Sequence, residues 1–142
     1  MTDKSSGGEL TDAERQAAAA GDLTVLAILM LVGSTSFAAI NWWLGTMGWL
    51  GAALTVSSTL VWSLGLLRRS PPIAAFVKIG FGFSGLAAPA VAAVGLLFAL
   101  VGNYQWGWAI LTGAVVYFFF SLLGLEIIER AENSGAIERF EL

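Results

Sequence analysis

Four long apolar runs, separated by short polar or turn-forming segments, dominate the chain. A single helix over the first run would be about 33 Å long, which is enough to cross a hydrocarbon core of about 30 Å. Only Lys78 and Glu126 bring a charge into any of the runs. The pattern therefore predicts an all-α, polytopic membrane protein with four transmembrane helices arranged as two up-down hairpins. The predicted spans cover about residues 23–44, 49–67, 73–101 and 106–128.

The connections indicate which helices are neighbours. The segments 45–48 and 102–105 are too short to join helices that do not touch, so the first and second helices should form one hairpin and the third and fourth another. Pro71 and Pro72 follow two arginines and should stop the second helix, because proline cannot continue one. The third run would be about 43 Å long if straight, and Pro89 inside it predicts a helix bend.

Polar tails flank the predicted membrane domain of residues 23–128. In the N-terminal tail, residues 1–22, Thr11 and Glu14 have the spacing of a capping box, which predicts a short helix that Gly21 would end. The charged C-terminal tail, residues 129–142, should continue the fourth helix for a few residues, with Gly135 as its stop.

Composition narrows the chemistry that is expected. Hydrophobic residues make up 57% of the chain and charged residues 12%, about half the share of a soluble domain. Cysteine and histidine are absent, which removes thiol nucleophiles, thiolate or imidazole metal ligands and any Ser-His-Asp triad. We therefore expect neither an enzyme nor a bound cofactor or metal. The net charge of −3 argues against a nucleic-acid partner, which leaves the lipid bilayer and other membrane proteins.

The distribution of basic residues predicts the orientation. In a four-span arrangement all seven fall on one side, and Arg68 and Arg69 form the strongest topology signal. The positive-inside rule then places both termini in the cytoplasm of a multi-pass protein of the cell membrane. Aromatic rings, which favour the membrane interface, gather at the two opposite turns and form an interfacial belt. The belt comprises Trp42, Trp43, Trp49, Tyr104, Trp106 and Trp108.

The two predicted hairpins share a sequence pattern. The segment 41–45 carries Asn, aromatic residues and Gly and precedes Gly51-Ala52, and the segment 103–107 carries the same types before Gly113-Ala114, in a register of 62 residues. This favours a parallel 2+2 repeat with its pseudo-axis along the membrane normal. The alternative is that short membrane turns draw on the same few residue types.

Two features of the third and fourth runs could carry function. Lys78 and Glu126 lie at comparable depths near the same membrane face, so they form a candidate intramembrane charge pair or a cation or proton site, unless each simply extends toward water. The segment 80–85 matches G-x-G-x-x-G but follows no strand, so it does not indicate a dinucleotide site. Small residues at a four-residue spacing instead predict a helix-packing face. This face comprises Gly80, Ser84, Ala88 and Ala92.

Two functions remain open. The first is a non-catalytic subunit or an assembly or accessory factor that acts through lateral helix packing, either with copies of itself or within a larger membrane complex. The alternative is a small transporter or channel that works as a homo-oligomer, which the hydroxyl-rich first and second helices would suit. Convergence of these hydroxyls with Lys78 on one polar cavity would favour transport, and their dispersal into helix contacts would favour a subunit.

Overall fold

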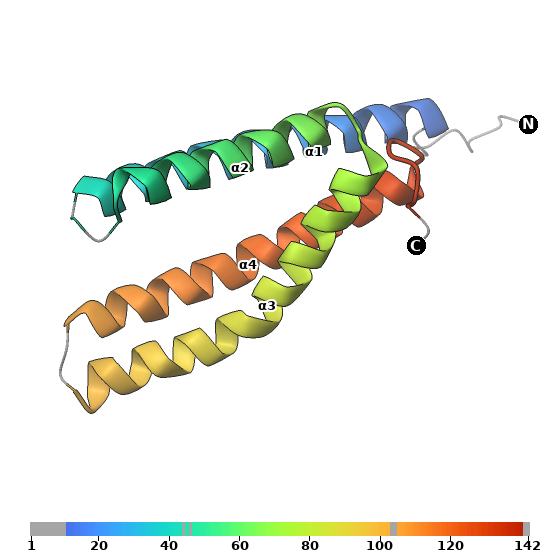
Figure 1. Cartoon of the computed structure of the whole chain (residues 1–142). Coiled ribbons are helices and arrows are strands. Elements are labelled where there is room, and N and C mark those ends of the chain that lie inside the picture. Colours follow the sequence, from blue (N-terminus) through green and yellow to red (C-terminus); the bar gives the residue numbers. More distant parts are fainter. Residues whose placement is uncertain (1–10, 44, 46, 103–104, 141–142) are drawn as a thin grey trace, which may run out of the picture.

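A computed structural model describes residues 11–43, 45, 47–102 and 105–140, with the side chains of residues 105 and 106 excepted. The described chain is all-helical, and each of its four helices is long and apolar enough to cross a membrane (Figure 1). The helices are α1 (Asp12–Trp43), α2 (Trp49–Leu67), α3 (Pro71–Leu100) and α4 (Gln105–Asn133).

Local interactions define several of the helix ends. The Glu14 backbone N–H donates to Thr11 Oγ1 at 3.3 Å, and the Thr11 N–H donates to Glu14 Oε2 at 2.7 Å, so the predicted capping box is confirmed. Pro71 and Pro72 occupy the first turn of α3, where no backbone donor is needed. Gly135 has a φ of +74°, a conformation that suits glycine just beyond the last turn of α4.

The predicted helix break at Gly21 is wrong, because α1 runs through this residue without interruption. A glycine inside a helix costs only about 1 kcal/mol relative to alanine. Ala19 before it and Leu23 after it are both buried in the core, so packing on both sides holds the helix together.

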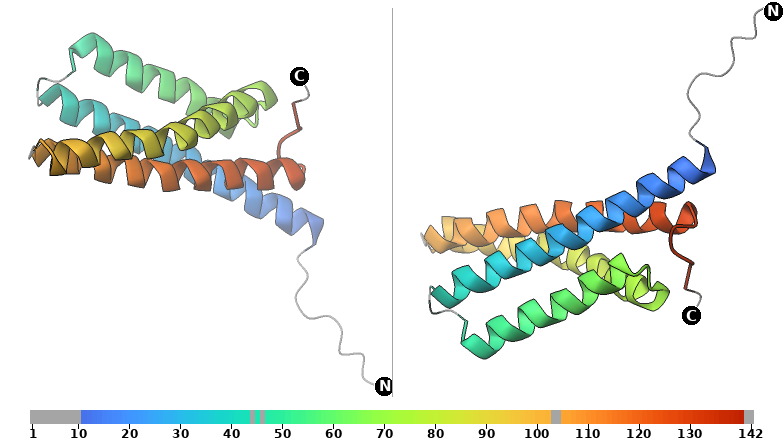
Figure 2. Two further views of the ribbon diagram at one scale, coloured as in Figure 1. Left: turned by 90° about the horizontal axis from the view of Figure 1, so that it is seen from below. Right: turned by 90° about the horizontal axis from the view of Figure 1, so that it is seen from above.

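The four helices form two hairpins that meet at one end and diverge toward the other (Figures 1 and 2). We call the end where they meet the terminal end; it contains the start of α1, the α2–α3 connection and residues 134–140. We call the other the turn end, with the connections after α1 and α3. The most extensive contacts lie within the hairpins, between α3 and α4 and between α1 and α2, and smaller contacts of α1 with α4 and of α2 with α3 join the hairpins.

The hydrophobic core lies in the half of the molecule nearer the terminal end. Its large members come from all four helices and from the segment that follows α4, where Ile137 is buried. The turn-end half buries mainly small residues between the two helices of each hairpin. The core comprises Ala19, Leu23, Leu26, Ala27, Leu66, Ala74, Val77, Phe81, Ile127, Ile128, Ala131, Ala136 and Ile137.

Two glycines allow α3 and α4 to touch near the turn end. A Cβ on Gly95 would lie 2.7 Å from the Leu111 backbone nitrogen, and one on Gly107 would lie 2.4 Å from the Ala99 nitrogen. Neither position has room for a side chain, so the two backbones are in direct contact here. This is the close approach that small residues provide in membrane helix pairs.

The first hairpin lacks this contact. In the 62-residue register Gly33 stands where Gly95 stands in the second hairpin, yet a Cβ on Gly33 would meet no atom within 4 Å. The 2+2 repeat thus stays a prediction from the sequence, and the two hairpins pack differently at this pair of positions.

The third helix changes direction about midway, where its colour passes from yellow-green to yellow in Figure 1. Pro89 lies inside α3 in this region, and it has no N–H to donate to the carbonyl of Gly85 one turn earlier. The bend lets the first half of α3 reach the α1–α2 hairpin while the second half follows α4.

Candidate functional site between the two hairpins

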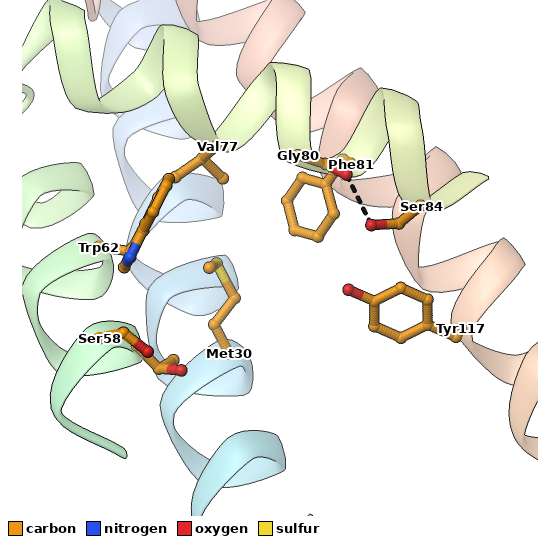
Figure 3. A pocket seen from close by; sticks show the side chains of 9 residues that line it. Met30, Ser58, Trp62, Val77, Gly80, Phe81, Ser84 and Tyr117 are labelled. Atoms are coloured by element: carbon orange, nitrogen blue, oxygen red, sulfur yellow. Dashed lines mark hydrogen bonds between the residues drawn. The ribbon is translucent and has the colours of Figure 1, made fainter. Parts of the chain in front are cut away.

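A pocket of about 210 Å³ lies where the hairpins begin to diverge, and it is open on one side (Figure 3). All four helices contribute to it. None of the described charged residues lines it, and its walls combine aromatic rings, a methionine, small residues and hydroxyls. The lining residues are Met30, Ser58, Thr59, Trp62, Val77, Gly80, Phe81, Ser84 and Tyr117.

The serine and threonine hydroxyls of the pocket are already engaged with backbone carbonyls. Ser58 and Thr59 both donate to the Thr55 carbonyl, at 3.0 and 2.9 Å, and Ser84 donates to Gly80 at 2.6 Å. Outside the pocket, Thr35 donates to Leu31 in the same way, at 2.7 Å. Such bonds to the preceding turn leave the oxygens free only to accept.

Tyr117 and Trp62 carry the remaining side-chain donor groups among the lining residues. Figure 3 shows the Tyr117 hydroxyl directed toward the space between Met30, Phe81 and Ser84. Among the described residues, neither this hydroxyl nor the Trp62 indole N–H has a hydrogen-bond partner. Sequence reasoning missed both residues, although a signal was present: of the six tryptophans and two tyrosines, these are the two that lie away from the turns after the first and third runs.

Beyond the pocket, toward the turn end, the diverging hairpins leave helix faces that no described residue covers. On α4, Ala131, Ile127 and Phe120 belong to or pack on the core, and the same helical stripe continues outward as Gly113 and Ala109, which are exposed. A Cβ on Gly113 would meet no atom within 4 Å.

The first hairpin continues past the pocket in the same manner. Ser34 lies one turn beyond Met30 on α1, and Thr55 lies one turn beyond Thr59 on α2. Both are only partly exposed, and both donate their hydroxyl protons to their own helix, to Leu31 and Gly51 respectively. We call Ser34, Thr55, Ala109 and Gly113 together the open faces.

The charges near the terminal end pair differently from the sequence expectation. Lys78 does not bond to Glu126; its Nζ lies 2.7 Å from Glu132 Oε2, and Arg139 Nε lies 4.0 Å from the same oxygen. Glu126 instead pairs with Arg130 one turn later on an exposed face of α4. The reason is that α4 continues beyond residue 128 and places Glu132, not Glu126, opposite the start of α3.

The segment after α4 folds back onto the terminal end. Gln16 Nε2 on α1 donates to the Gly135 carbonyl at 2.9 Å, and the Arg139 Nη2 donates to Asn133 Oδ1 at 3.2 Å. Together with buried Ile137, these contacts close the bundle on the side where Lys78 and Glu132 meet.

The predicted packing face is divided in the structure. Ala88 is buried, whereas Gly80 and Ser84 line the pocket and a Cβ on Gly80 would meet no atom within 4 Å. Ala92 is partly exposed. The tightest contact of α3 is instead made by Gly95, as described above.

The topology signal and the aromatic belt lie at opposite ends of the molecule. Arg68 and Arg69 are exposed in the α2–α3 connection at the terminal end, and Arg69 has a φ of 55°. Four members of the belt are exposed at the turn end, whereas Tyr104 and the side chain of Trp106 lie outside the described residues. The exposed four are Trp42, Trp43, Trp49 and Trp108.

Two buried hydroxyls lie away from the pocket. Ser63 and Ser121 have no hydrogen-bond partner among the described residues, and neither lines the pocket. Ser121 instead faces α3, since a Cβ on Gly85 would lie 3.7 Å from its Cβ.

Comparisons of the chain with protein-family models, with curated proteins and with solved structures gave no match.

Proposed function

We propose that this protein is a non-catalytic membrane subunit or accessory factor that holds a transmembrane helix of its partner between its two hairpins. The observation that carries the proposal is the chemistry of the open faces. Small and hydroxyl side chains are typical of helix–helix contacts inside membranes, where they allow backbones to approach closely. In this protein Ala109 and Gly113 are exposed and Ser34 and Thr55 are partly exposed, on the faces that continue outward from the pocket.

The continuity of α4 supports the same proposal. Ala131, Ile127 and Phe120 on this helix belong to or pack on the core that all four helices share, whereas Gly113 and Ala109 further out are exposed. A partner helix entering from the turn end would continue an existing helix interface and would not need a new one.

The placement of hydroxyls and charges favours a subunit over a transporter. The hydroxyls of Ser34, Thr55 and Ser84 each donate to a carbonyl of their own helix. The Lys78 ammonium is engaged with Glu132 at the terminal end, and Lys78 does not line the pocket. The pocket gathers the hydroxyls of Ser58, Thr59 and Ser84, but Lys78 does not join them, so the hydroxyls and the charge that a transport path would use do not meet in one cavity.

The proposed orientation of the protein in the membrane rests on the distribution of its basic residues. Arg68 and Arg69 lie at the same end as residues 11–20 and 134–140, so the positive-inside rule would put this whole end in the cytoplasm of a cell membrane. The open faces would then look toward the opposite side of the bilayer.

The mass of the protein extracted into native nanodiscs tests the proposal. We expect the wild-type chain to be recovered in a particle with at least one further protein chain, and the double variant Ala109→Leu, Gly113→Leu to be recovered alone. The matched control is Gly82→Leu, Ala90→Leu on α3, two positions that line neither the pocket nor the open faces. It should behave as the wild type.

The mass of the wild-type particle distinguishes the possible partners. A second copy of this chain in the particle would identify self-association, and a different chain would identify a larger complex. A wild-type particle with a single chain would overturn the proposal. So would ion or solute flux into liposomes that depends on the purified protein, because it would establish the transport alternative.

A further inference from the structure

The pocket between the hairpins has properties that a helix-docking surface does not require. It lies on the core side of the open faces, and three aromatic side chains, Trp62, Phe81 and Tyr117, surround it. Phe81 is held in place by an edge-to-face contact with Phe120 of α4, at a centroid distance of 5.7 Å. Phe81 and Trp62 are thus packed in or on the core and do not depend on a partner, while Tyr117 is 48% exposed at the opening.

The volume of the pocket indicates the size of its ligand. A dry protein cavity of about 150 Å³ holds one benzene ring. The pocket here has about 210 Å³ and opens on one side. It therefore has room for a single six-membered ring with substituents, or for an ester group of similar bulk, while a hydrocarbon tail leaves through the opening.

The hydrogen-bonding groups indicate the chemistry of the ligand. Tyr117 lies twelve residues after the start of α4 at Gln105, about 18 Å along the helix, which is well inside a hydrocarbon core of about 30 Å. Lipid tails cannot accept a hydrogen bond, so an unpaired hydroxyl at this depth is costly. The Trp62 ring belongs to the same lining, and no charged residue of the described chain lines the pocket to hold an ionised ligand. A neutral acceptor meets these conditions.

We propose that this pocket binds a neutral, lipid-soluble carbonyl compound. Its head, a flat ring or a lipid ester, lies between Trp62, Phe81 and Tyr117, and the Tyr117 hydroxyl donates to its carbonyl oxygen. The hydroxyl oxygens of Ser58, Thr59 and Ser84, whose protons are already donated, can accept from any hydroxyl that the ligand carries. The inference does not rest on the proposed function, because it uses none of the open faces.

Quenching of tryptophan fluorescence provides the test, with a short-chain benzoquinone as the probe in detergent-solubilised protein. We expect a saturable component of quenching in the wild type that disappears in Trp62→Phe, since Trp62 is the tryptophan in the pocket wall. Tyr117→Phe keeps the ring and removes the donor, so its half-saturation concentration should rise about three- to tenfold, the loss of one hydrogen bond.

A second pair of variants separates binding from folding. Gly80→Leu fills the pocket at a position with no atom within 4 Å, so the fold should be kept while saturable quenching is lost. Gly82→Leu, two residues away on the same helix and equally free of neighbours, should bind as the wild type. Circular dichroism checks that both variants keep the helix content.

Competition identifies the source of the ligand. If diacylglycerol shifts the quinone titration, the pocket takes a lipid ester; if it does not, the pocket prefers a ring carbonyl. Quenching that rises linearly with probe concentration and is equal in the wild type, Tyr117→Phe and Gly80→Leu would overturn the inference. That result would leave the nanodisc masses unaffected, so the two proposals fail independently.

Discussion

Lys78 on α3 and Glu132 on α4 form an ion pair, with 2.7 Å between Nζ and Oε2. The Glu132 side chain is only 6% exposed, whereas that of Lys78 is 35% exposed. The pair joins the start of one helix to the end of the next and lies beside the segment that folds back after α4. It therefore ties three parts of the terminal end to one carboxylate.

Removal of Lys78 should destabilise the protein because, within the described part of the chain, it leaves the buried Glu132 carboxylate with Arg139 as its one remaining cation, at 4.0 Å. We expect Lys78→Met to lower the free energy of unfolding by about 1–3 kcal/mol. This is less than the loss expected when a fully buried ion pair is broken, because the lysine is partly exposed. Thermal unfolding in detergent, followed by circular dichroism, measures the loss. Glu126→Gln, which breaks the exposed pair with Arg130, should cost under about 1 kcal/mol. Equal effects of the two variants would contradict this account.

The backbone contact between α3 and α4 should be intolerant of a methyl group. We expect Gly95→Ala and Gly107→Ala each to lower stability by about 1–3 kcal/mol, because the new Cβ would lie within 2.7 Å of a backbone nitrogen of the facing helix. Gly113→Ala on α4 is the control, since its Cβ meets open space. The same unfolding measurement applies, and a wild-type melting temperature for Gly95→Ala would show that the helices are further apart than described.

Replacement of Pro89 should straighten α3, because alanine restores the N–H that proline lacks. Spin labels on cysteines at the exposed positions Ile79 and Leu97 would report the change, and the chain has no other cysteine. The two positions are five helical turns apart, which is about 27 Å in a straight helix. We expect Pro89→Ala to give that distance by pulsed electron spin resonance and the unsubstituted proline to give a different one. The same distance in both would assign the bend to another cause.

The proposed orientation predicts which connection reacts with an impermeant reagent. A cysteine at Met47, in the connection after α1, should be labelled by a charged maleimide in intact cells. A cysteine at Ser70, next to the arginine pair, should react only after the membrane is permeabilised. The reverse pattern would place the terminal end outside the cell and contradict the positive-inside argument.

Much of the fold could be predicted from the sequence because the signals are local. The second span, residues 49–67, has the bounds of α2, since two turn segments with Gly and Pro flank it. The orientation of helices within each hairpin follows from connections too short for any other arrangement. Gly21 is the exception, because a weak local preference competes with core packing at Ala19 and Leu23.

The candidate site was harder to predict because it depends on which helix faces meet. Glycine and alanine occur at helical spacing on several faces, so spacing alone could not distinguish the pocket wall at Gly80 from the close contact at Gly95. The partner of Lys78 could not be found without the length of α4. Tyr117 could be recognised as a pocket residue only once its place in the middle of α4 and the divergence of the hairpins were known.

Because the hairpins diverge, they are held together mainly by the core at the terminal end. A change in the angle between the hairpins would break few contacts between them, because those contacts are concentrated in the core at the terminal end. Changing the angle between the hairpins should therefore cost little free energy. The angle should respond to a molecule that occupies the space between the hairpins at the turn end, or to lateral pressure from the surrounding membrane. A thinner bilayer favours tilted helices, so it should increase the angle between the two hairpins without unfolding either hairpin.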